Sequence, residues 1–330
     1  MNELKLDKSN VLITGGLGLI GSNLAKVLVN LGAQVTILDN MLAPYGGNIF
    51  NINDFRNKID VISGDVRDWT LIEKIVKNRD VIFHLAAQVD QYIAMENPQL
   101  DLEINCRGTL NVLEGCRLHN PKAKIVFTSS RVVIGEPEYL PVDEDHPTNP
   151  KNIYGVDKLF SEKYCQFYNE IYDLRTSILR LSNVYGPRAQ LRYPNYGVLN
   201  LFVGYALTNR AIPIYGDGLQ TRDYIFVEDV LKALILAAEN EKSEGKIFFV
   251  GSGIETTIRD MAKLVIEIAG KGNYEFVGKS STLSKTDIKR FATNYSRIRG
   301  VLGWNPETSL HQGITNTVKF YRENLEKYLP

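Results

Sequence analysis

The chain of 330 residues contains only 3 cysteines and 4 histidines. The cysteines, Cys106, Cys116 and Cys165, are odd in number and form no CxxC pair, so neither a disulfide framework nor a zinc cluster is indicated. The histidines are scattered without metal-ligand spacing, so we predict no metal site. The cysteine pattern fits a reducing compartment best.

An excess of charge of either sign is also missing, because 38 Lys and Arg balance 38 Asp and Glu. A protein without a basic surplus is a poor candidate for nucleic-acid or anionic-membrane binding. No apolar run approaches the roughly 20 residues that a membrane-spanning helix needs. The opening MNELKLDKSN has no apolar core of a signal peptide. We therefore expect no nucleic-acid or membrane partner and a cytoplasmic location.

The first half of the chain alternates short β-branched runs with stretches of helical periodicity. The strands are nearly continuous apolar runs, which is typical of parallel sheets buried on both faces. We expect strands over 10–14, 34–38, 60–63, 80–85, 124–128 and 175–181, and helices over 19–31, 69–78, 100–118 and 154–172. The pattern predicts an α/β fold, a doubly wound parallel sheet of the Rossmann type.

After Leu181 the alternation is lost in the passage SNVYGPRAQLRYPNYG, where we place a domain boundary. The later part predicts helices over 199–208, 227–239, 257–269 and 310–328, and a strand over 246–250. Because 224–250 again reads as strand, helix and strand, we expect it to return to the main sheet. The first domain then comprises 1–181 with 224–250, and a smaller C-terminal α/β domain comprises 182–223 and 251–330.

A glycine-rich turn, TGGLGLIGSNL, follows the first predicted strand directly. Gly15, Gly18 and Gly21 leave room for close backbone approach, and the helix that begins at Leu19 and Ile20 offers N–H groups to a pyrophosphate. Asp39 ends the next strand, 24 residues beyond Gly15, where an acidic side chain accepts both ribose hydroxyls. Asn40 follows and no arginine is adjacent, so NAD is favoured over NADP. The alternative is a tight turn without a ligand.

The fifth predicted strand ends in Thr-Ser-Ser, and Tyr154 follows Ser130 by 24 residues, with Lys158 four positions further. Positions i and i+4 share one face of a helix, so a phenol and an ammonium can reach one site. A nearby cation lowers a tyrosine pKa. Tyr154 could then remove the proton of a substrate hydroxyl that Ser130 holds. The alternative is a surface Tyr and Lys pair of no catalytic meaning.

The chain resembles the extended short-chain dehydrogenases/reductases of the NAD-dependent epimerase/dehydratase family, which act on nucleotide sugars. The segments that carry the resemblance, beside those above, are GDVRD, HLAAQV, NCRGTLNVLEGC, YGVDK, LRLSNVYGPR, YGDGLQTRDYIFVEDV and LGWNPETSL. The resemblance implies that NAD contacts the glycine turn, Asp39, Asn40, Asp65, Val66, Leu85, Ala86, Ala87, Tyr154 and Lys158. It also implies that the larger domain binds NAD and the smaller one a nucleotide-diphosphate sugar, with substrate contacts from Ser130, Arg131, Asn183, Asn200, Arg222 and Arg290. Of these, Asn183 and Arg222 are expected to hold the diphosphate. Two of these have plain structural alternatives: Asn183 as a turn cap and Arg222 as the partner of Asp223.

Members of this family are expected to begin by oxidising C4 of the sugar. Its dehydratases carry acidic residues just after the catalytic Ser or Thr, for elimination across C5 and C6, whereas this chain has Arg131 and Val132 there. We therefore favour a 4-epimerase. The alternative is a 4-dehydrogenase that releases the 4-keto sugar; a 4,6-dehydratase, a decarboxylase and a non-catalytic NAD-binding regulator are less favoured.

Two departures bear on the sugar. The usual VYG reads VIG at 133–135, and an RPGD-like segment reads SKTD at 284–287, without its arginine. Lys285, Lys289 or Arg290 could substitute for it. The resemblance also implies self-association through the helices near 100–118 and 154–172, giving a homodimer or a larger oligomer, although these faces could simply cover the sheet. A role in making precursors of cell-surface polysaccharide follows from the substrate class alone.

Overall fold

The computed structural model describes residues 5–42, 47–193, 197–278 and 286–329. The strands are β1 (Asn10–Thr14), β2 (Gln34–Asp39), β3 (Asp60–Ser63), β4 (Val81–His84), β5 (Lys124–Ser130), β6 (Arg175–Leu181), β7 (Asn183–Tyr185), β8 (Ala211–Tyr215), β9 (Thr221–Phe226), β10 (Ile247–Val250), β11 (Glu255–Thr257) and β12 (Asn273–Val277). The helices are α1 (Leu19–Asn30), α2 (Trp69–Ile75), α3 (Gln91–Glu96), α4 (Pro98–Leu102), α5 (Gly108–His119), α6 (Ile153–Tyr172), α7 (Val198–Leu207), α8 (Val227–Glu239), α9 (Ile258–Ala269), α11 (Ser296–Leu302) and α12 (Leu310–Asn324).

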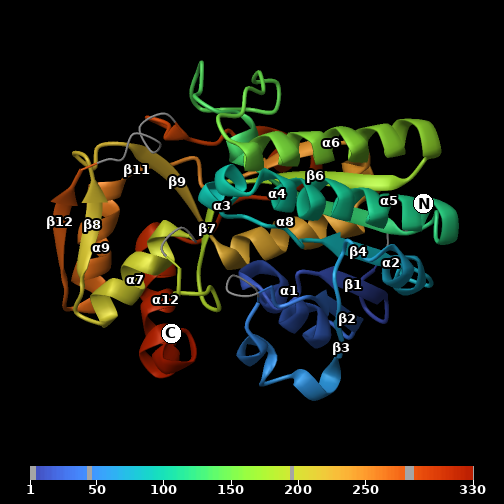
Figure 1. Ribbon diagram of the computed structural model, residues 1–330, viewed down its shortest axis with the longest axis horizontal. Coiled ribbons are helices and arrows are strands. Elements are labelled where there is room, and N and C mark those ends of the chain that lie inside the picture. The colour runs from blue at the N-terminus through green and yellow to red at the C-terminus, as the bar shows by residue number, and fades with distance from the viewer. Residues whose placement is uncertain (1–4, 43–46, 194–196, 279–285, 330) are drawn as a thin grey trace.

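The main sheet has seven strands in the order β10-β6-β5-β4-β1-β2-β3, and every pairing in it is parallel. All residues of β4 are buried, as are the residues of β1 after the first. Helices therefore cover both faces, with α5 and α6 on one side and α1 and α8 on the other (Figure 1). The predicted doubly wound fold is confirmed.

One predicted helix is interrupted. The stretch expected as a single helix over 100–118 consists of α4, a π-helical turn over Glu103–Arg107, and α5. The wider turn shifts the helical register, and the Asn105 side chain lies buried, donating to the Gln88 carbonyl oxygen at 2.9 Å. Hydrophobic periodicity does not distinguish such a turn from continuous α-helix.

The second part of the molecule is built on two small sheets. One has the order β11-β9-β7, and the other pairs β12 with β8. Of the segment expected to return to the main sheet, β10 does so, pairing with β6, whereas β9 pairs with β7 and β11. Because β7 begins two residues after β6 ends, the small sheet starts at the carboxyl edge of the main one.

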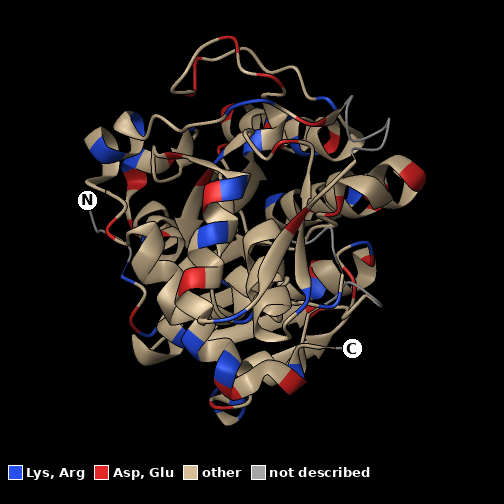
Figure 2. Ribbon diagram, turned by 90° about the vertical axis from the view of Figure 1, so that its left-hand side faces the viewer, with Lys and Arg blue, Asp and Glu red and all other residues tan. Residues whose placement is uncertain are grey.

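Charges of both signs are spread over the molecule. On the side shown in Figure 2, segments of Lys and Arg alternate with segments of Asp and Glu. Within the described ranges, no helix is both long and apolar enough to cross a membrane. The same ranges contain no group of three or more His, Cys, Asp or Glu side chains placed to hold a metal ion.

Candidate active site

A cavity of about 670 Å³ lies at the carboxyl edge of the main sheet. The ends of β1, β2, β4, β5 and β6 contribute Gly15, Asp39, Leu85, Ser130 and Leu181 to its wall. Residues from the second part of the chain, among them Asn183, Asn200 and Arg222, close the opposite side. Ligands of open α/β sheets bind at this edge.

The glycine turn has the close packing that the motif demands. Gly15 has a φ of +71°, and a Cβ there would lie 2.8 Å from the Ala86 backbone. A Cβ on Gly21 would lie 2.3 Å from the Gly15 carbonyl oxygen. Gly18 at the start of α1 has no side chain to cap the helix, and Leu19 and Ile20 line the cavity. The N-terminus of α1 therefore presents its N–H groups to a ligand anion.

Asp39 is buried beside this turn. Its carboxylate accepts hydrogen bonds from the backbone N–H of Leu17 at 2.9 Å and of Met41 at 2.8 Å. Burial nevertheless raises the pKa of Asp39 above its usual value. Asp39 and Asn40 both line the cavity, so an acidic side chain stands where a ribose would bind and where a 2′-phosphate would be repelled.

Asp65 lies just outside this wall, although its neighbour Val66 lines it. Although burial opposes it, hydrogen bonds from Arg67 and Asn40 lower the pKa of Asp65 to about 2. Asp65 thus holds Asn40 in place within the described structure.

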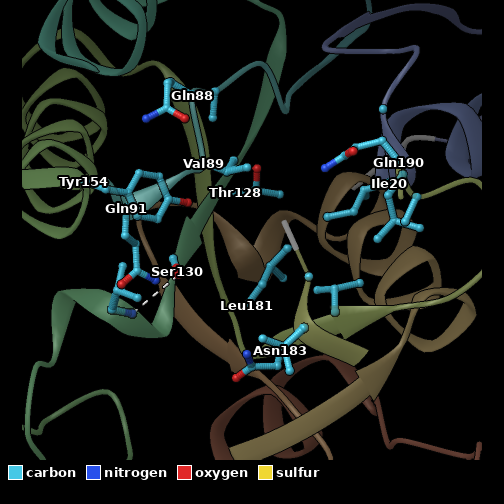
Figure 3. A pocket seen from close by; sticks show the side chains of 18 of the residues that line it. Ile20, Gln88, Val89, Gln91, Thr128, Ser130, Tyr154, Leu181, Asn183 and Gln190 are labelled. Atoms are coloured by element: carbon cyan, nitrogen blue, oxygen red, sulfur yellow. Dashed lines mark hydrogen bonds between the residues drawn. The ribbon is translucent and has the colours of Figure 1, made fainter. Parts of the chain in front are cut away.

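Ser130, Tyr154 and Lys158 come together on one wall of the cavity. Asn152 caps α6 by accepting from the Gly155 N–H at 2.9 Å, which starts the helix where its first turn carries Tyr154. In Figure 3, Tyr154 lies with Ser130 and Thr128, and Ile20 and Gln190 lie across the cavity. Tyr154 and Lys158 are 7% and 2% exposed, so both are nearly removed from bulk water.

The electrostatics differ from the sequence prediction. Burial raises the pKa of Tyr154 far above its usual value; the charge of Asp101 adds to this, while the Ser130 hydroxyl and the charge of Arg131 oppose it. Burial lowers the pKa of Lys158 to about 8, and its ammonium lies 4.2 Å from the centre of the Phe127 ring. The sequence predicts that a nearby cation lowers the Tyr154 pKa; Arg131 has that effect here, but burial outweighs it.

Arg131 follows Ser130 directly and is also buried in the cavity wall. Its Nε donates to Asn183 Oδ1 at 2.7 Å. Asn183 is therefore a partner of Arg131 rather than a cap of its own turn. Sequence spacing could not reveal this contact, because 52 residues separate the two.

Arg222 pairs with Asp287, and not with Asp223. Its Nη1 also donates to the Ile288 carbonyl oxygen at 3.0 Å. Asp223 instead accepts backbone N–H groups, including that of Ser252 at 2.8 Å. Arg222 lines the cavity and is held in place by these contacts.

The structure does not bring every predicted substrate residue to the cavity in the same way. Asn200 lines it, but its amide is engaged with the Gly186 backbone, donating at 2.6 Å and accepting at 3.1 Å. Arg290 lies outside the lining, on the surface, paired with Glu255. Ser284 and Lys285 lie outside the described residues.

The cavity also contains polar residues that the sequence did not single out: Gln88, Gln91, Arg188, Gln190 and Tyr224. Within the described part of the chain, the buried Nε2 of Gln190 and the hydroxyl of Tyr224 have no hydrogen-bond partner. For three of them the available signal was their position in HLAAQV, LRLSNVYGPR and YGDGLQTRDYIFVEDV, which hold Gln88, Arg188 and Tyr224. Gln190 lies in the boundary passage SNVYGPRAQLRYPNYG, and Gln91 lies outside all of these segments. Which of their side chains face the cavity depends on the packing of the second part against the first.

Residues 12–317 match the family model described as GDP-mannose 4,6 dehydratase. A putative UDP-glucose 4-epimerase of Methanocaldococcus jannaschii is 39% identical over 95% of this chain and 99% of its own length. A dTDP-glucose 4,6-dehydratase of Actinoplanes is 30% identical, over 95% and 98%. A UDP-N-acetyl-alpha-D-glucosaminuronate decarboxylase of Bacillus cytotoxicus is 31% identical, over 96% and 98%.

Solved structures of epimerases have the same fold as this chain. The epimerase Mth375 of Methanothermobacter thermautotrophicus superposes with a TM-score of 0.91 at 30% identity, covering 97% of this chain and 94% of that one. The UDP-glucose 4-epimerase of Thermus thermophilus, solved in complex with NAD, superposes with a TM-score of 0.85 at 33% identity, covering 95% and 99%. With the glycine turn, Asp39 and the Ser-Tyr-Lys group in place, the chain belongs to the extended short-chain dehydrogenase/reductase family of nucleotide-sugar epimerases and dehydratases.

Proposed function

We propose that the protein binds NAD and oxidises C4 of a nucleotide-linked sugar to the 4-keto sugar. The observation that carries this proposal is the meeting of Ser130, Tyr154 and Lys158 in the cavity that the glycine turn and Asp39 also line. The open N-terminus of α1 fits a pyrophosphate, and the Asp39 carboxylate fits a ribose. A related epimerase of the same fold was solved with NAD, which supports the choice of cofactor.

Each side chain has a defined task in this reaction. Ser130 holds the C4 oxygen by a hydrogen bond, and Tyr154 takes the hydroxyl proton as general base. NAD, when bound, accepts the hydride that leaves C4. Because burial favours the neutral phenol, positive charge beside the ring is needed to make Tyr154 a base at neutral pH. Arg131 supplies part of that charge, and Lys158 holds further positive charge in the same wall.

Among the reactions open to a 4-keto sugar, we favour C4 epimerisation. Val132 has no proton-transferring group and Arg131 is engaged with Asn183, so neither position offers a base for the C5 proton. Relatives named as 4-epimerases support the same choice. The alternative remains a 4-dehydrogenase that releases its ketone and leaves reduced cofactor.

Product analysis separates the two. Purified enzyme is incubated with UDP-, GDP- and CDP-linked hexoses and heptoses, and the products are identified by NMR and mass spectrometry. We expect a C4-inverted sugar of unchanged mass with no net reduced cofactor. A 4-keto sugar that accumulates with stoichiometric reduced cofactor would establish the dehydrogenase instead.

Tyr154→Phe tests the assigned base. Removing the hydroxyl is expected to lower kcat by about 10²-fold or more, because the proton acceptor is lost, while NAD still binds. Turnover is measured with the accepted sugar, and NAD binding by calorimetry. The matched control is Tyr164→Phe on the same helix, which removes a hydroxyl that makes no hydrogen bond to the described residues, and it should keep wild-type kcat. Full activity of Tyr154→Phe would overturn the assignment.

A further inference from the structure

The Arg131 guanidinium is held rigidly in the cavity wall. It is only 9% exposed, its Nε is fixed by Asn183 Oδ1 at 2.7 Å, and its carbon lies 5.3 Å from the centre of the Phe291 ring. A planar group fixed along one edge and over one face keeps its remaining N–H groups in one direction. Such an arrangement is pre-organised for a planar, bidentate anion.

The remaining donors of Arg131 have no acceptor in the described parts of the protein. Neither Nη1 nor Nη2 makes a hydrogen bond there. The nearby carboxylates are engaged elsewhere, Asp287 with Arg222 and Asp223 with backbone N–H groups. Burial, and next the like charge of Arg222, lower the pKa of Arg131 to about 9, which still leaves it cationic at neutral pH. A buried cation without a bonded anion is costly, so a ligand anion would be bound strongly here.

The position of Arg131 identifies the part of the substrate it faces. Ser130, which holds the C4 oxygen in the proposed reaction, is its neighbour in sequence, and both line the cavity. The charge of Arg131 also reaches the Tyr154 phenol. The guanidinium therefore lies within electrostatic range of the proposed base and next in the chain to the residue proposed to hold the C4 oxygen.

We propose that Arg131 binds a carboxylate carried by the sugar ring, so that the substrate is a nucleotide-linked uronic acid rather than a neutral hexose. This inference rests on the proposed C4 oxidation at the same site. Arg131 is then the residue that selects the substrate, and Asn183 is the positioning residue that holds its guanidinium.

The same contact would control the fate of the oxidised sugar. A uronic acid oxidised at C4 is a β-keto acid: if the C5–C6 bond breaks, its electron pair enters the C4 enolate, carbon dioxide leaves, and C5 then takes a proton. Carbon dioxide is neutral, so its release loses the ion pair with the guanidinium. Because Arg131 stabilises the carboxylate, it opposes the release of carbon dioxide. The product is therefore expected to retain all its carbons.

The test uses two substrates that differ only at C6, UDP-glucose and UDP-glucuronate, with the NAD-loaded enzyme. We expect the wild type to prefer UDP-glucuronate. Arg131→Met should lower the ratio of kcat/KM for UDP-glucuronate to that for UDP-glucose by about 10²-fold or more, because the sugar carboxylate loses its guanidinium partner. Arg131→Lys should recover part of this ratio, since lysine restores the positive charge but cannot donate two parallel hydrogen bonds from a planar group. Arg299→Met, which changes an exposed residue of α11, is the matched control and should keep the wild-type ratio.

Two outcomes of this experiment would contradict the proposed carboxylate contact. Equal losses of kcat/KM on both sugars would mean that Arg131 acts on the diphosphate or only on Tyr154, and not on a sugar carboxylate. No loss on either sugar would leave it without a substrate role. Each result overturns the proposal. Calorimetric Kd values for the two nucleotide sugars are measured in parallel. If the wild type oxidises neither sugar, nor matched GDP- and dTDP-linked pairs, the proposed function fails, while these Kd values still decide whether Arg131 recognises a carboxylate.

Discussion

At the scale of single residues, Gly21 shows why the glycine turn tolerates no side chain. A Cβ there would meet the Gly15 carbonyl oxygen at 2.3 Å and the Gly16 Cα at 2.6 Å, so backbone must move. We predict that Gly21→Ala weakens NAD binding by at least about tenfold, because the added Cβ pushes the turn and the start of α1 apart. Calorimetric titration with NAD measures this.

The matched control for that variant is Gly300→Ala in α11, where a Cβ meets nothing within 4 Å. Because alanine is the better helix former, this change should preserve NAD affinity and raise the free energy of unfolding by up to about 1 kcal/mol. If both variants bound NAD as the wild type does, the close packing of the turn would have no role in cofactor binding.

At the scale of elements, α4 and α6 bring two buried carboxyl groups together beside the active site. Asp101 and Asp157 are 0% and 5% exposed, and within the described residues the Oδ2 atom of each has no hydrogen-bond partner. Burial first, and then the neighbouring Asp157 carboxyl group, raise the pKa of Asp101 to about 7. A proton shared by the two carboxyl groups satisfies both oxygens, as in other close carboxylate pairs.

This pair predicts a pH dependence of stability. Between about pH 4 and 7 the folded protein holds a proton that the unfolded chain has lost, so the Asp101 contribution to stability falls as pH rises. The Asp101→Asn variant should not lose this stability. We therefore expect the free energy of unfolding of the variant minus that of the wild type to increase by about 2 kcal/mol from pH 5 to pH 8. Urea denaturation at several pH values measures it.

A double variant, Asp101→Asn with Asp157→Asn, tests whether the two carboxyl groups share a proton. If the two carboxyl groups share one proton, the effects of the two substitutions at pH 8 should be clearly non-additive. A pH-independent difference between Asp101→Asn and the wild type, or simple additivity, would contradict a shared proton.

At the scale of the whole molecule, α6 carries an apolar stripe that the described residues leave exposed. Phe160, Phe167 and Ile171 are 45%, 49% and 58% exposed, and their spacing of seven and four residues places them on one helix face. α5 lies beside this helix (Figure 1). The stripe supports the prediction that a second copy of the chain packs on this side.

We expect the wild type to have at least twice the chain mass in solution, and Phe160→Ser with Phe167→Ser to shift it to the monomer, because the stripe loses its apolar area. Sedimentation equilibrium measures the mass. Phe276→Ser, which changes a 54% exposed phenylalanine on β12, is the control and should not alter it. A monomeric wild type would contradict the prediction.

Much of the architecture follows from local pattern. The strands of the main sheet are apolar runs with helices between them, and their predicted positions agree with the structure to within about two residues at each end. The glycine turn, Asp39 and the Tyr154–Lys158 spacing are likewise readable, because a turn, a strand end and one helical face are each set by residues near in sequence.

The chain alone thus determined the parallel sheet, the dinucleotide-type turn and the meeting of a phenol and an ammonium on one helix face. Only the tertiary structure decided that Arg131 joins Asn183, that Arg222 joins Asp287, and that Asp101 reaches Asp157. The physical reason is distance along the chain: these partners lie on different elements, and their contacts exist only once burial of the apolar faces has fixed how those elements pack. Charge and proton positions in the site follow from that packing, because burial dominates the pKa of Tyr154 and of Lys158.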